Sequence, residues 1–478
     1  MISSRSFGCA VLVFLTSLIA PIHANELADL MLAAQENNPA IRAARWRVEQ
    51  TLLKHEELLE FFDPALYGAV GYADRSRSIP GSSNYSALTN NSLDFQAGIE
   101  APIIPGAYVA AGIAERSLRD PAGFDDLYQT LFGVRVRVPL LRDRAFRTLT
   151  LSRSLAAMEY NIAVSRLLRS TQDLRREIEL AYISAYESLA AYQVTRQATA
   201  RFRNLYEEAQ ELSRLKVVPQ YQTFQSQLEL QIGREDEEKA RNRHELNLIT
   251  LAGAVGDKKT IALTADPGAL FEQASAQQDL PQLEEAIILQ HRGDYLEMLN
   301  SVEYAKIQQA TAKEETRDDL SLNIGVNWQG ENENWPYGND DIVSDRRVGG
   351  EVTLVWKRTL DYRGPKARMA RHRARIEELK AEMGNIEVDI NTELQHAILN
   401  YNTARQRLEL VNHGIAAARE TVAAEQERFR LGESTSSNVT DAQKNLTSIL
   451  QRQNTAAADL LRAKANFYHA IGYYLGNE

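Results

Sequence analysis

The sequence predicts an α+β membrane protein in which one unit of helix, strands and long helices occurs twice. Three observations predict this fold class. The chain matches itself at constant offsets, each copy holds apolar spacings far longer than a globular helix, and short segments between them alternate apolar with polar residues. Together they indicate a small sheet joined to long helical rods.

Composition excludes several classes of protein. The 478 residues are 44% hydrophobic and 25% charged, which is the composition of a folded chain. The net charge of −10, without a basic cluster, argues against a nucleic-acid surface. No segment after the N-terminus holds about 18 consecutive apolar residues, so no membrane-spanning helix is predicted.

Residues 1–24 are predicted to be a secretory signal peptide. Arg5 precedes an apolar run from Cys9 to Ala20, and Ala24 supplies the small residue of a cleavage site. Cys9 is the only cysteine, so the mature chain would contain no disulfide and packing alone would hold it.

An internal repeat is the strongest feature of the sequence. An offset of 256 places Asp63 on Asp319, and an offset of 216 places Arg214 on Arg430. The offsets differ by 40, so the first copy holds about 40 extra residues between its strands.

The repeat divides the mature chain into a first structural repeat, residues 25–256, a linker, residues 257–280, and a second repeat, residues 281–478. Each repeat is predicted to run helix, strand, loop, strand, very long helix, tight turn and long return helix. The turns fall near residues 214–222 and 430–438.

The long helices are predicted over residues 145–215 and 365–431, with return helices over 221–254 and 438–473. At about 1.5 Å per residue, each long helix is a rod of roughly 100 Å. Alternating spacings of three and four predict coiled-coil packing, for example along Leu394, Ala397, Tyr401, Ala404, Leu408, Val411 and Ile415. A soluble coiled-coil rod would show the same seam.

Three segments alternate with a period of two: FGVRVRVPLL (132–141), SLNIGVNW (321–328) and EVTLVWK (351–357). Apolar faces that reach Trp328 or Trp356, with Arg, Asn, Gly or Thr opposite, suit a transmembrane barrel with lipid outside and water inside. An ordinary antiparallel sheet, half buried in a soluble protein, accounts for the alternation equally well.

Two clearly paired strands in each repeat predict four strands per chain. Four strands cannot enclose a lumen, so several chains would have to contribute to one barrel. The extra residues of the first repeat, 93–116, alternate only weakly. They fit either further barrel strands or a separate hairpin.

The chain resembles the outer-membrane efflux family, the TolC-like exit ducts. The resemblance rests on NPAIRAA (38–44), on the two-fold repeat and on FRLGESTSSNVTDAQKNL (429–446), and it covers nearly the whole mature chain. It implies a homotrimeric channel with a twelve-stranded β-barrel, four strands per chain, continued by a long α-helical coiled-coil tunnel. It also implies the outer membrane of a Gram-negative bacterium, with the tunnel extending into the periplasm.

The resemblance further implies a passive pore, gated at its periplasmic end, for efflux of small molecules or type I secretion of polypeptides. Its partners would be a periplasmic adaptor (membrane fusion) protein, an inner-membrane pump of the ABC, RND or MFS type and outer-membrane lipid, with no nucleic acid and no cofactor. The alternative is a structural coiled-coil protein of the periplasm or cell surface without transport activity.

A candidate gate lies in the second turn and rests on this resemblance. Asp441 matches the inner of two aspartates that ring the family's pore entrance, and it either forms an anionic collar or complements the positive end of its helix. Asn438 stands at the outer aspartate position, and the side chains from Ser434 to Asn438 are expected to include the cap of the return helix, with Asn438 as one candidate. Phe429 and Ser434 replace a tyrosine and an arginine of the family gate, so other contacts are expected to hold the closed state.

Adaptor contacts are expected at the two helical tips. Arg214 and Arg430 recur at matching places, where they either bind an adaptor or favour the carbonyl end of their helices. Gly432 is expected to end one helix and Pro219 to stop the other. The expected contact residues are Arg214, Leu215, Lys216, Arg430, Leu431, Gly432 and Glu433.

The sequence does not predict an enzyme. RHELNL (243–248) begins like the zinc-protease motif but lacks its second histidine, and the eight histidines are scattered. No catalytic, cofactor-binding or metal-binding residue is therefore assigned.

Overall fold

The computed structural model describes residues 22–77, 88–103, 106–119, 127–257, 261–263, 266–275, 280–281, 283–332 and 347–472. The predicted signal peptide, residues 1–24, lies almost entirely outside the described residues. The described chain forms two compact units. One comprises residues up to Trp46, Ser165–Leu296 and Asn385 onward, and the other comprises Arg47–Val164 and Glu297–Gly384. Because these units cut across both repeats, the repeat boundaries stay a prediction.

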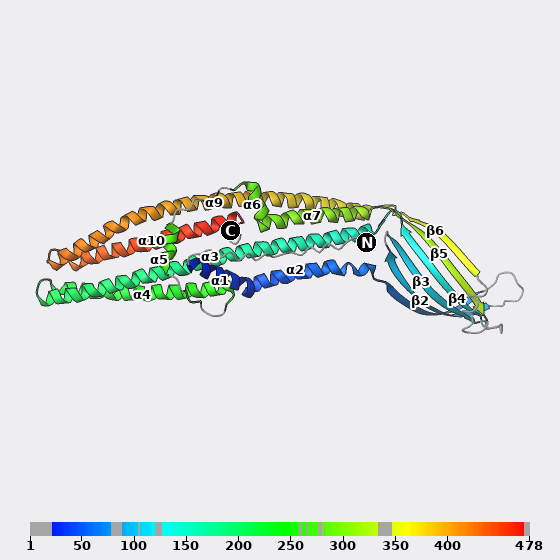
Figure 1. Ribbon diagram of the computed structural model, residues 1–478, viewed down its shortest axis with the longest axis horizontal. Helices are drawn as coiled ribbons and strands as arrows, with labels where there is room; N and C mark the ends of the chain where they lie inside the picture. The colour runs from blue at the N-terminus through cyan, green and yellow to red at the C-terminus, as the bar shows by residue number, and fades with distance from the viewer. Residues whose placement is uncertain are drawn as a thin grey trace. The chain divides into compact units, whose positions relative to one another are not determined.

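Long antiparallel helices make up most of the chain (Figure 1). The two long rods end within two residues of the predicted bounds, because their seams remain unbroken by Pro until the tips. The helices are α1 Ile22–Asn37, α2 Pro39–Glu57, α3 Arg147–Arg214, α4 Gln220–Val255, α5 Pro267–Ser275, α6 Glu285–His291, α7 Gly293–Glu314, α9 Arg363–Arg430 and α10 Ser436–Ala470.

The core of the helical unit lies where α1, α3 and α4 pack together. Tyr182 and Tyr186 of α3 are fully buried, and both hydroxyls donate to the Glu26 carboxylate of α1, at 3.0 and 2.6 Å. Leu251 of α4 is also buried in this cluster. A second seam joins α9 to α10 through Tyr401, Ala404 and Leu408, as the heptad spacing predicts, against alanines and Leu460 of α10.

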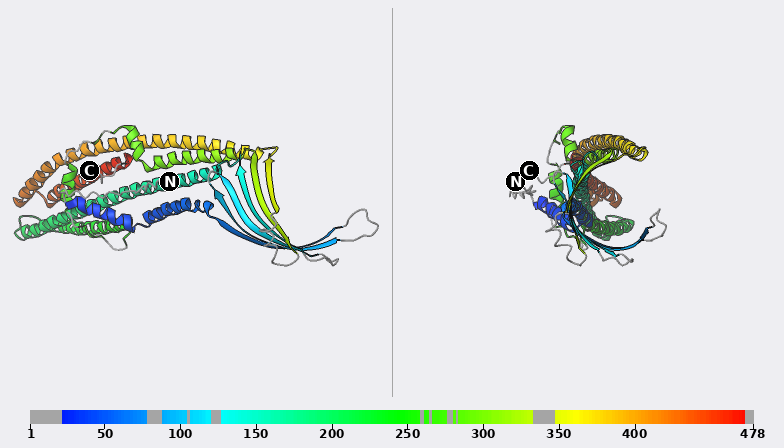
Figure 2. Two further views of the ribbon diagram at one scale, coloured as in Figure 1. Left: turned by 45° about the vertical axis from the view of Figure 1, so that its right-hand side comes forward. Right: turned by 90° about the vertical axis from the view of Figure 1, so that its right-hand side faces the viewer.

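The other unit contains one antiparallel sheet with strand order β1-β2-β3-β4-β5-β6. All six strands lie side by side in Figures 1 and 2. The strands are β1 Ala65–Arg77, β2 Leu88–Ile103, β3 Ala107–Arg119, β4 Leu127–Pro139, β5 Asp319–Asn332 and β6 Arg347–Lys357. A short 3-10 turn, η1 Glu60–Phe62, precedes β1.

The expected count of four strands per chain is wrong, because β2 and β3 belong to the same sheet. β2 pairs with β1 along its length, and β3 pairs with β4. Their alternation is weak because Ala97, Gly98, Ala111 and Gly112 place small side chains on both faces. The extra residues of the first repeat are therefore sheet strands rather than a separate hairpin.

Candidate functional site

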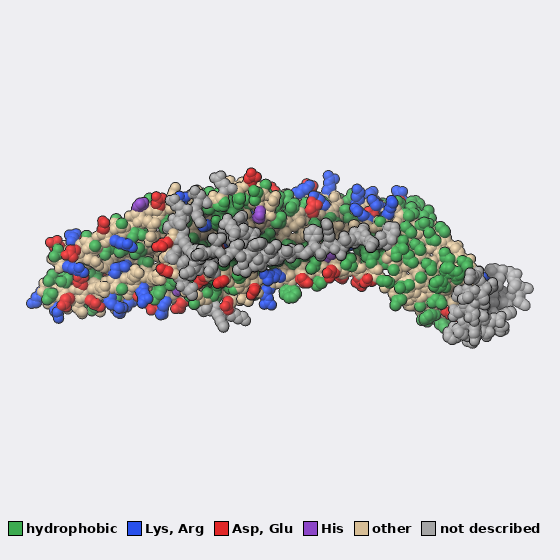
Figure 3. Space-filling model, in the orientation of Figure 1, with side chains coloured by type: hydrophobic (Ala, Val, Ile, Leu, Met, Phe, Trp, Pro, Cys, Tyr) green, Lys and Arg blue, Asp and Glu red, His purple; other side chains and the backbone are tan. Residues whose placement is uncertain are grey.

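One face of the sheet is apolar and exposed to solvent in a single chain. Figure 3 shows apolar side chains gathered over the strands. Leu66 is 85% exposed and Val352 is 74% exposed, whereas a soluble protein rarely leaves so large a contiguous patch uncovered. The exposed residues of this apolar face are Leu66, Val70, Tyr72, Leu93, Phe95, Ile99, Ile113, Phe132, Ile324, Val326, Val348, Val352, Leu354 and Trp356.

The opposite face carries small and polar side chains. Asp94 of β2 and Arg116 of β3 form an ion pair at 2.5 Å on this polar face. Besides the apolar Leu131 and Val355, the face includes Tyr67, Ala69, Gly71, Asp94, Gln96, Gly98, Glu100, Ala110, Gly112, Ala114, Arg116, Arg135, Arg137, Asn323, Asn327, Glu351 and Thr353. An apolar exterior and a polar interior are the arrangement of a transmembrane barrel wall.

Both outer edges of the sheet are open within the described residues. β1 pairs only with β2, and β6 pairs only with β5. An exposed strand edge presents a row of backbone donors and acceptors that a further strand satisfies. Among the described residues, both edges are therefore available for pairing with a further strand.

The two helical tips share one backbone geometry. Lys216, after α3, and Gly432, after α9, both have positive φ, of 60° and 75°. In each tip the amide one residue further on donates to a carbonyl five residues back, which is the Schellman arrangement. These bonds are Val217 to Leu212 at 2.9 Å and Glu433 to Arg428 at 2.8 Å.

An apolar cluster joins the two tips. Phe429 is fully buried with Val439, and both pack against Leu205, Ala209 and Val218 of the first hairpin. The ring of Phe429 thus fills a core between the hairpins, where no hydroxyl is needed.

Two ion pairs join the same hairpins. Arg430 lies 2.8 Å from Glu208 of α3, and Lys444 lies 2.8 Å from Glu229 of α4. Arg214 pairs instead with Glu211 of its own helix. The two tip arginines therefore differ in what they contact.

The contact between α4 and α10 is polar. The Gln222 side-chain carbonyl accepts from the Ser436 amide at 3.2 Å, and Ser226 and Thr440 are buried nearby in sequence on the same helices. Gln443 is 1% exposed, and neither polar atom of its side-chain amide has a hydrogen-bond partner. A buried unsatisfied amide weakens the interface that contains it.

The cap of α10 lies within the expected segment Ser434–Asn438, but it is not Asn438. The N-cap is Thr435, whose hydroxyl oxygen accepts from the Asn438 amide at 3.4 Å. The Asn438 side chain donates to Ser434 at 3.1 Å, and Ser434 donates to Glu425 at 2.7 Å. Threonine is a common N-cap, and Thr435 lies three residues before Asn438.

The remaining residues assigned from the sequence lie on the surface of the tips. Asp441 is exposed on α10, two turns or less from its N-terminus. Leu215 and Leu431 are 61% and 64% exposed despite being apolar. The other exposed tip residues are Arg214, Lys216, Arg430, Gly432 and Glu433.

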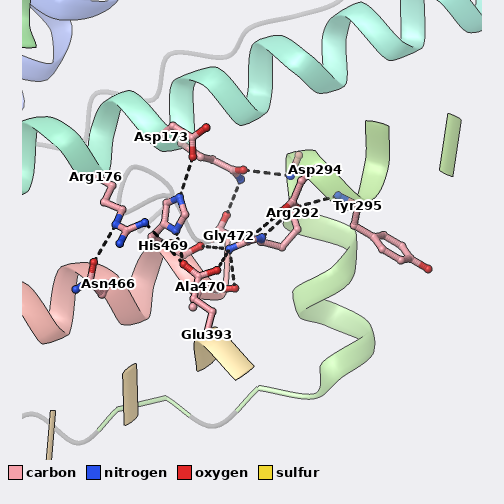
Figure 4. A network of polar contacts seen from close by, with 12 residues as sticks. Asp173, Arg176, Arg292, Asp294, Tyr295, Glu393, Asn466, His469, Ala470 and Gly472 are labelled. Atoms are coloured by element: carbon pink, nitrogen blue, oxygen red, sulfur yellow. Dashed lines mark hydrogen bonds and ion pairs between the residues drawn. The ribbon is translucent and has the colours of Figure 1, made fainter. Parts of the chain in front are cut away.

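Sequence reasoning missed a polar clasp in the helical unit, shown in Figure 4. Arg292, 7% exposed, pairs with Asp294 at 2.8 Å and with Glu393 of α9 at 3.0 Å. His469 of α10 places its two ring nitrogens 3.0 Å from Glu393 and 3.1 Å from Asp173 of α3. The clasp joins α3, α9, α10 and the α6–α7 connection.

Arg292 also donates hydrogen bonds to the last backbone carbonyls of α10. Its Nη1 donates to the carbonyls of His469 and Ala470, at 3.1 and 3.4 Å. Gln172 donates to the His291 carbonyl at 2.7 Å and accepts from the Gly293 amide at 3.1 Å. The last carbonyls of a helix need such partners when they are buried.

The charges of the clasp shift one another's pKa. Burial lowers the pKa of His469, but hydrogen bonds with Asp173 and Glu393 outweigh it, and the net pKa is raised. Burial raises the pKa of Glu393, but His469 and Arg292 outweigh it, and the net pKa is lowered. The clasp therefore favours an imidazolium between carboxylates.

The described residues bring no three His, Cys, Asp or Glu side chains into a metal-binding group. Among the helices that the structure describes, none combines the length and apolar character needed to cross a membrane.

Comparisons with known proteins agree on the fold. Residues 344–473 match the model of the outer membrane efflux protein family. No curated protein matches the chain. Similar solved structures include the outer membrane protein VceC from Vibrio cholerae, with 14% identity, 94% of this chain and 96% of that chain covered, and a TM-score of 0.66.

Two further channels are similar at the same level. The Campylobacter jejuni CmeC outer membrane channel has 12% identity, covers 93% of this chain and 85% of its own, and gives a TM-score of 0.66. The open state of the Neisseria gonorrhoeae MtrE outer membrane channel has 14% identity, with 93% and 88% covered and a TM-score of 0.65. Residues 344–473 are thus similar to the outer membrane efflux protein family, and the fold along most of the chain is similar to those of these outer membrane channels.

Proposed function

We propose that three copies of this chain form an outer-membrane efflux channel of a Gram-negative bacterium, with the long helices extending into the periplasm. The exposed apolar face of a sheet with two open edges carries this proposal. Six strands are too few to enclose water, so copies must join edge to edge. Lipid then covers the apolar face, and the polar face lines the pore.

Unpartnered apolar stripes on the helices support the same assembly. Val388, Leu399 and Leu410 of α9 are exposed and eleven residues apart, which is about three helical turns. Phe224 and Leu228 of α4 form a second exposed stripe. Neighbouring copies would bury these stripes in coiled-coil contacts.

Within this proposal the channel is a passive duct. Cargo and energy come from an inner-membrane pump through a periplasmic adaptor that contacts the exposed tips. Leu215 and Leu431 supply apolar anchors, flanked by Arg214 and Glu433. The tips carry both positive and negative side chains, so an adaptor would contact a differently charged surface at each tip.

The gate would open where α10 meets α4. Gln443 of α10 is buried with an unpartnered amide, and separation of α10 from its neighbours would return that amide to water. Phe429, the Arg430–Glu208 pair and the Lys444–Glu229 pair oppose the separation. Asp441 would form an anionic collar near the threefold axis of the closed trimer.

Matched lysine substitutions on β5 test the assignment of the two faces. Val326→Lys puts a charge on the apolar face, at a cost of about 2–4 kcal/mol at the bilayer midplane. Asn327→Lys puts the same charge on the polar face. Val326→Lys is expected to abolish heat-modifiable trimers in outer-membrane fractions, while Asn327→Lys keeps them.

A soluble periplasmic monomer, equally tolerant of both substitutions, would contradict the channel and support a structural coiled-coil protein. Ion conductance of the purified wild-type trimer in planar bilayers is the second required result. A trimer that inserts but never conducts, even after Phe429→Ala, would also overturn the proposal.

A further inference from the structure

The β2–β3 hairpin is built as part of the wall. Each of its strands is hydrogen-bonded on both sides, β2 to β1 and β3, and β3 to β2 and β4. A flap lying over a barrel would have at least one free edge. The hairpin therefore extends the sheet from four strands to six.

The turn of the hairpin packs closely against the residues that precede α3. Gly106, between β2 and β3, has φ +120°, and a Cβ there would lie 2.5 Å from the Ala145 Cα. Tyr108 of β3 packs edge-on against Phe146, with ring centroids 5.3 Å apart, and Phe146 is 5% exposed. Ala145 and Phe146 themselves hold positive φ, which only well-determined packing sustains.

The middle of the hairpin's polar face carries small residues. On its polar face Tyr67 lies flat across β2 and β3, because Gly98 and Gly112 leave room for its ring. A Cβ at Gly98 would lie 2.5 Å from that ring, and a Cβ at Gly112 would lie 2.6 Å from its hydroxyl. The neighbouring positions Ala110 and Ala114 are also small. Around Gly98 and Gly112 the hairpin therefore projects little into a lumen, and its longer polar side chains, Asp94, Gln96, Glu100 and Arg116, lie to either side.

The stagger of the strands matches a closed barrel. The row of directly paired residues that starts at Ala65 reaches β6 at Glu351, through Glu100, Ala110, Arg135 and Gly325. β6 continues from 351 to its end at Lys357, six residues beyond the row. Six residues over five strand spacings, at about 3.3 and 4.8 Å, give a tilt of about 40°. Closed barrels tilt by about 35–45°.

We propose that three copies close an eighteen-stranded barrel, in which β6 of each copy pairs with β1 of the next, and that the β2–β3 hairpin sets the width of the membrane pore. This inference rests on the trimeric channel proposed above. With strands about 4.8 Å apart and tilted by about 40°, eighteen strands give a backbone diameter of about 36 Å, against about 24 Å for twelve. The backbone diameter of the membrane segment is then half again as large.

The joint between copies has a defined register. β6 and β1 run in opposite directions, and pairing Lys357 with Ala65 keeps the polar faces of the two strands on the same side. Thr353 then lies opposite Ala69, both on the polar face. Because the side-chain period is two, a slip by one residue would turn one strand inside out.

Disulfide trapping tests this joint in the intact protein, whose only cysteine is Cys9. Thr353→Cys with Ala69→Cys is expected to give covalent trimers on gels without reductant. The matched control, Thr353→Cys with Val70→Cys, places the thiols on opposite faces and is expected to stay unlinked. Covalent dimers without trimers, which would close twelve strands, would overturn the inference.

Thiol accessibility tests whether the hairpin faces lipid on one side and water on the other. In reconstituted trimers, a charged thiol reagent is expected to modify Gln96→Cys and to leave Ile99→Cys unmodified. Asn327→Cys and Val326→Cys on β5 provide the same contrast in a strand that both barrels contain. Equal modification of the two β2 thiols, with the β5 contrast intact, would contradict the inference.

End-on electron micrographs of wild-type trimers give the width directly. A backbone diameter near 24 Å instead of 36 Å would overturn the inference while the channel itself stands. Absence of any conducting trimer would instead remove the proposed function. The two failures are therefore distinguishable.

Discussion

Lys216 and Gly432 occupy equivalent positions after the two 68-residue helices α3 and α9, and both hold a left-handed backbone conformation. The repeat offset of 216 relates them. Glycine adopts this conformation without strain, whereas lysine incurs a steric penalty of about 1 kcal/mol. The same position of the repeat is thus occupied by lysine in one copy and by glycine in the other, and only glycine adopts this backbone conformation without strain.

Lys216→Gly is therefore expected to stabilise the first tip by up to about 1 kcal/mol, and Gly432→Ala to destabilise the second by about 1 kcal/mol. Amide hydrogen exchange in the last turns of α3 and α9 measures each tip separately. With glycine at both positions, in the Lys216→Gly variant, the two tips should exchange at matching rates. Faster exchange at the first tip of this variant than in the wild type would contradict this account.

Phe429→Ala is expected to loosen the two hairpins, because it empties a fully buried site in a small apolar cluster. Losing a buried Phe side chain costs about 3–5 kcal/mol. Single-channel recordings should show longer open times and higher mean conductance. Phe429→Leu is the control, since it keeps most of the volume and should stay close to the wild type.

Gln443→Leu is expected to act in the opposite direction. It replaces an amide with two unpartnered polar atoms by an apolar side chain of similar size, which favours the closed contact by about 1–3 kcal/mol. Lower open probability would support the proposal. Combination with Phe429→Ala should partly restore closure, and an unchanged or higher open probability in the single variant would reject it.

Asp441→Asn is expected to relieve block by trivalent cations while changing ion conductance little. Three exposed carboxylates near one axis attract multivalent cations, and the amide removes that charge without changing size. Planar-bilayer titration with a trivalent cation measures the block. The nearby Glu433→Gln serves as control, and equal block in wild type and Asp441→Asn would refute the collar.

The clasp predicts a pH dependence of the helical unit. A raised pKa of His469 in the folded chain means that its stabilisation is complete below the unfolded value of about 6.5 and is lost as pH rises through the folded pKa. The lowered pKa of Glu393 adds stabilisation above about 4.3, which is lost as pH falls through the folded value.

Thermal unfolding followed by helical circular dichroism should therefore give its highest midpoint between about pH 4.5 and 6.5. The midpoint is expected to fall by a few °C toward pH 9, since about 1 kcal/mol shifts a midpoint by about 2–4 °C. His469→Gln should remove the alkaline limb and also weaken the acid limb, because His469 and Arg292 together lower the pKa of Glu393 and only Arg292 remains. An alkaline limb that persists in this variant would assign it to another group.

The sequence predicted the rods well because their signal is repeated many times. Three-and-four spacing over many heptads defines α9 to within two residues at its start and one at its end. Gly432 ends α9 as expected, whereas α3 ends at Arg214 with Lys216 at positive φ, and Pro219 is instead the N-cap of α4. These features depend on short-range chemistry that a single sequence carries.

The missed features depend on distant residues. The hairpin β2–β3 was not assigned from the sequence, because Gly98 and Gly112 make room for the Tyr67 ring and so weaken the alternation of apolar and polar residues. The clasp joins Arg292 to Glu393 and His469 across 101 and 177 positions, and no local pattern marks such a meeting. The sequence limited the cap of α10 to Ser434–Asn438, and the structure selects Thr435, three residues before Asn438.

The Tyr67 side chain lies across two neighbouring strands of its own chain, so β1 is braced from within before any other molecule arrives. An edge that is already rigid loses little conformational freedom on association. Each copy would therefore associate with its neighbours as a preformed third of the barrel, and assembly would require little rearrangement of the strands.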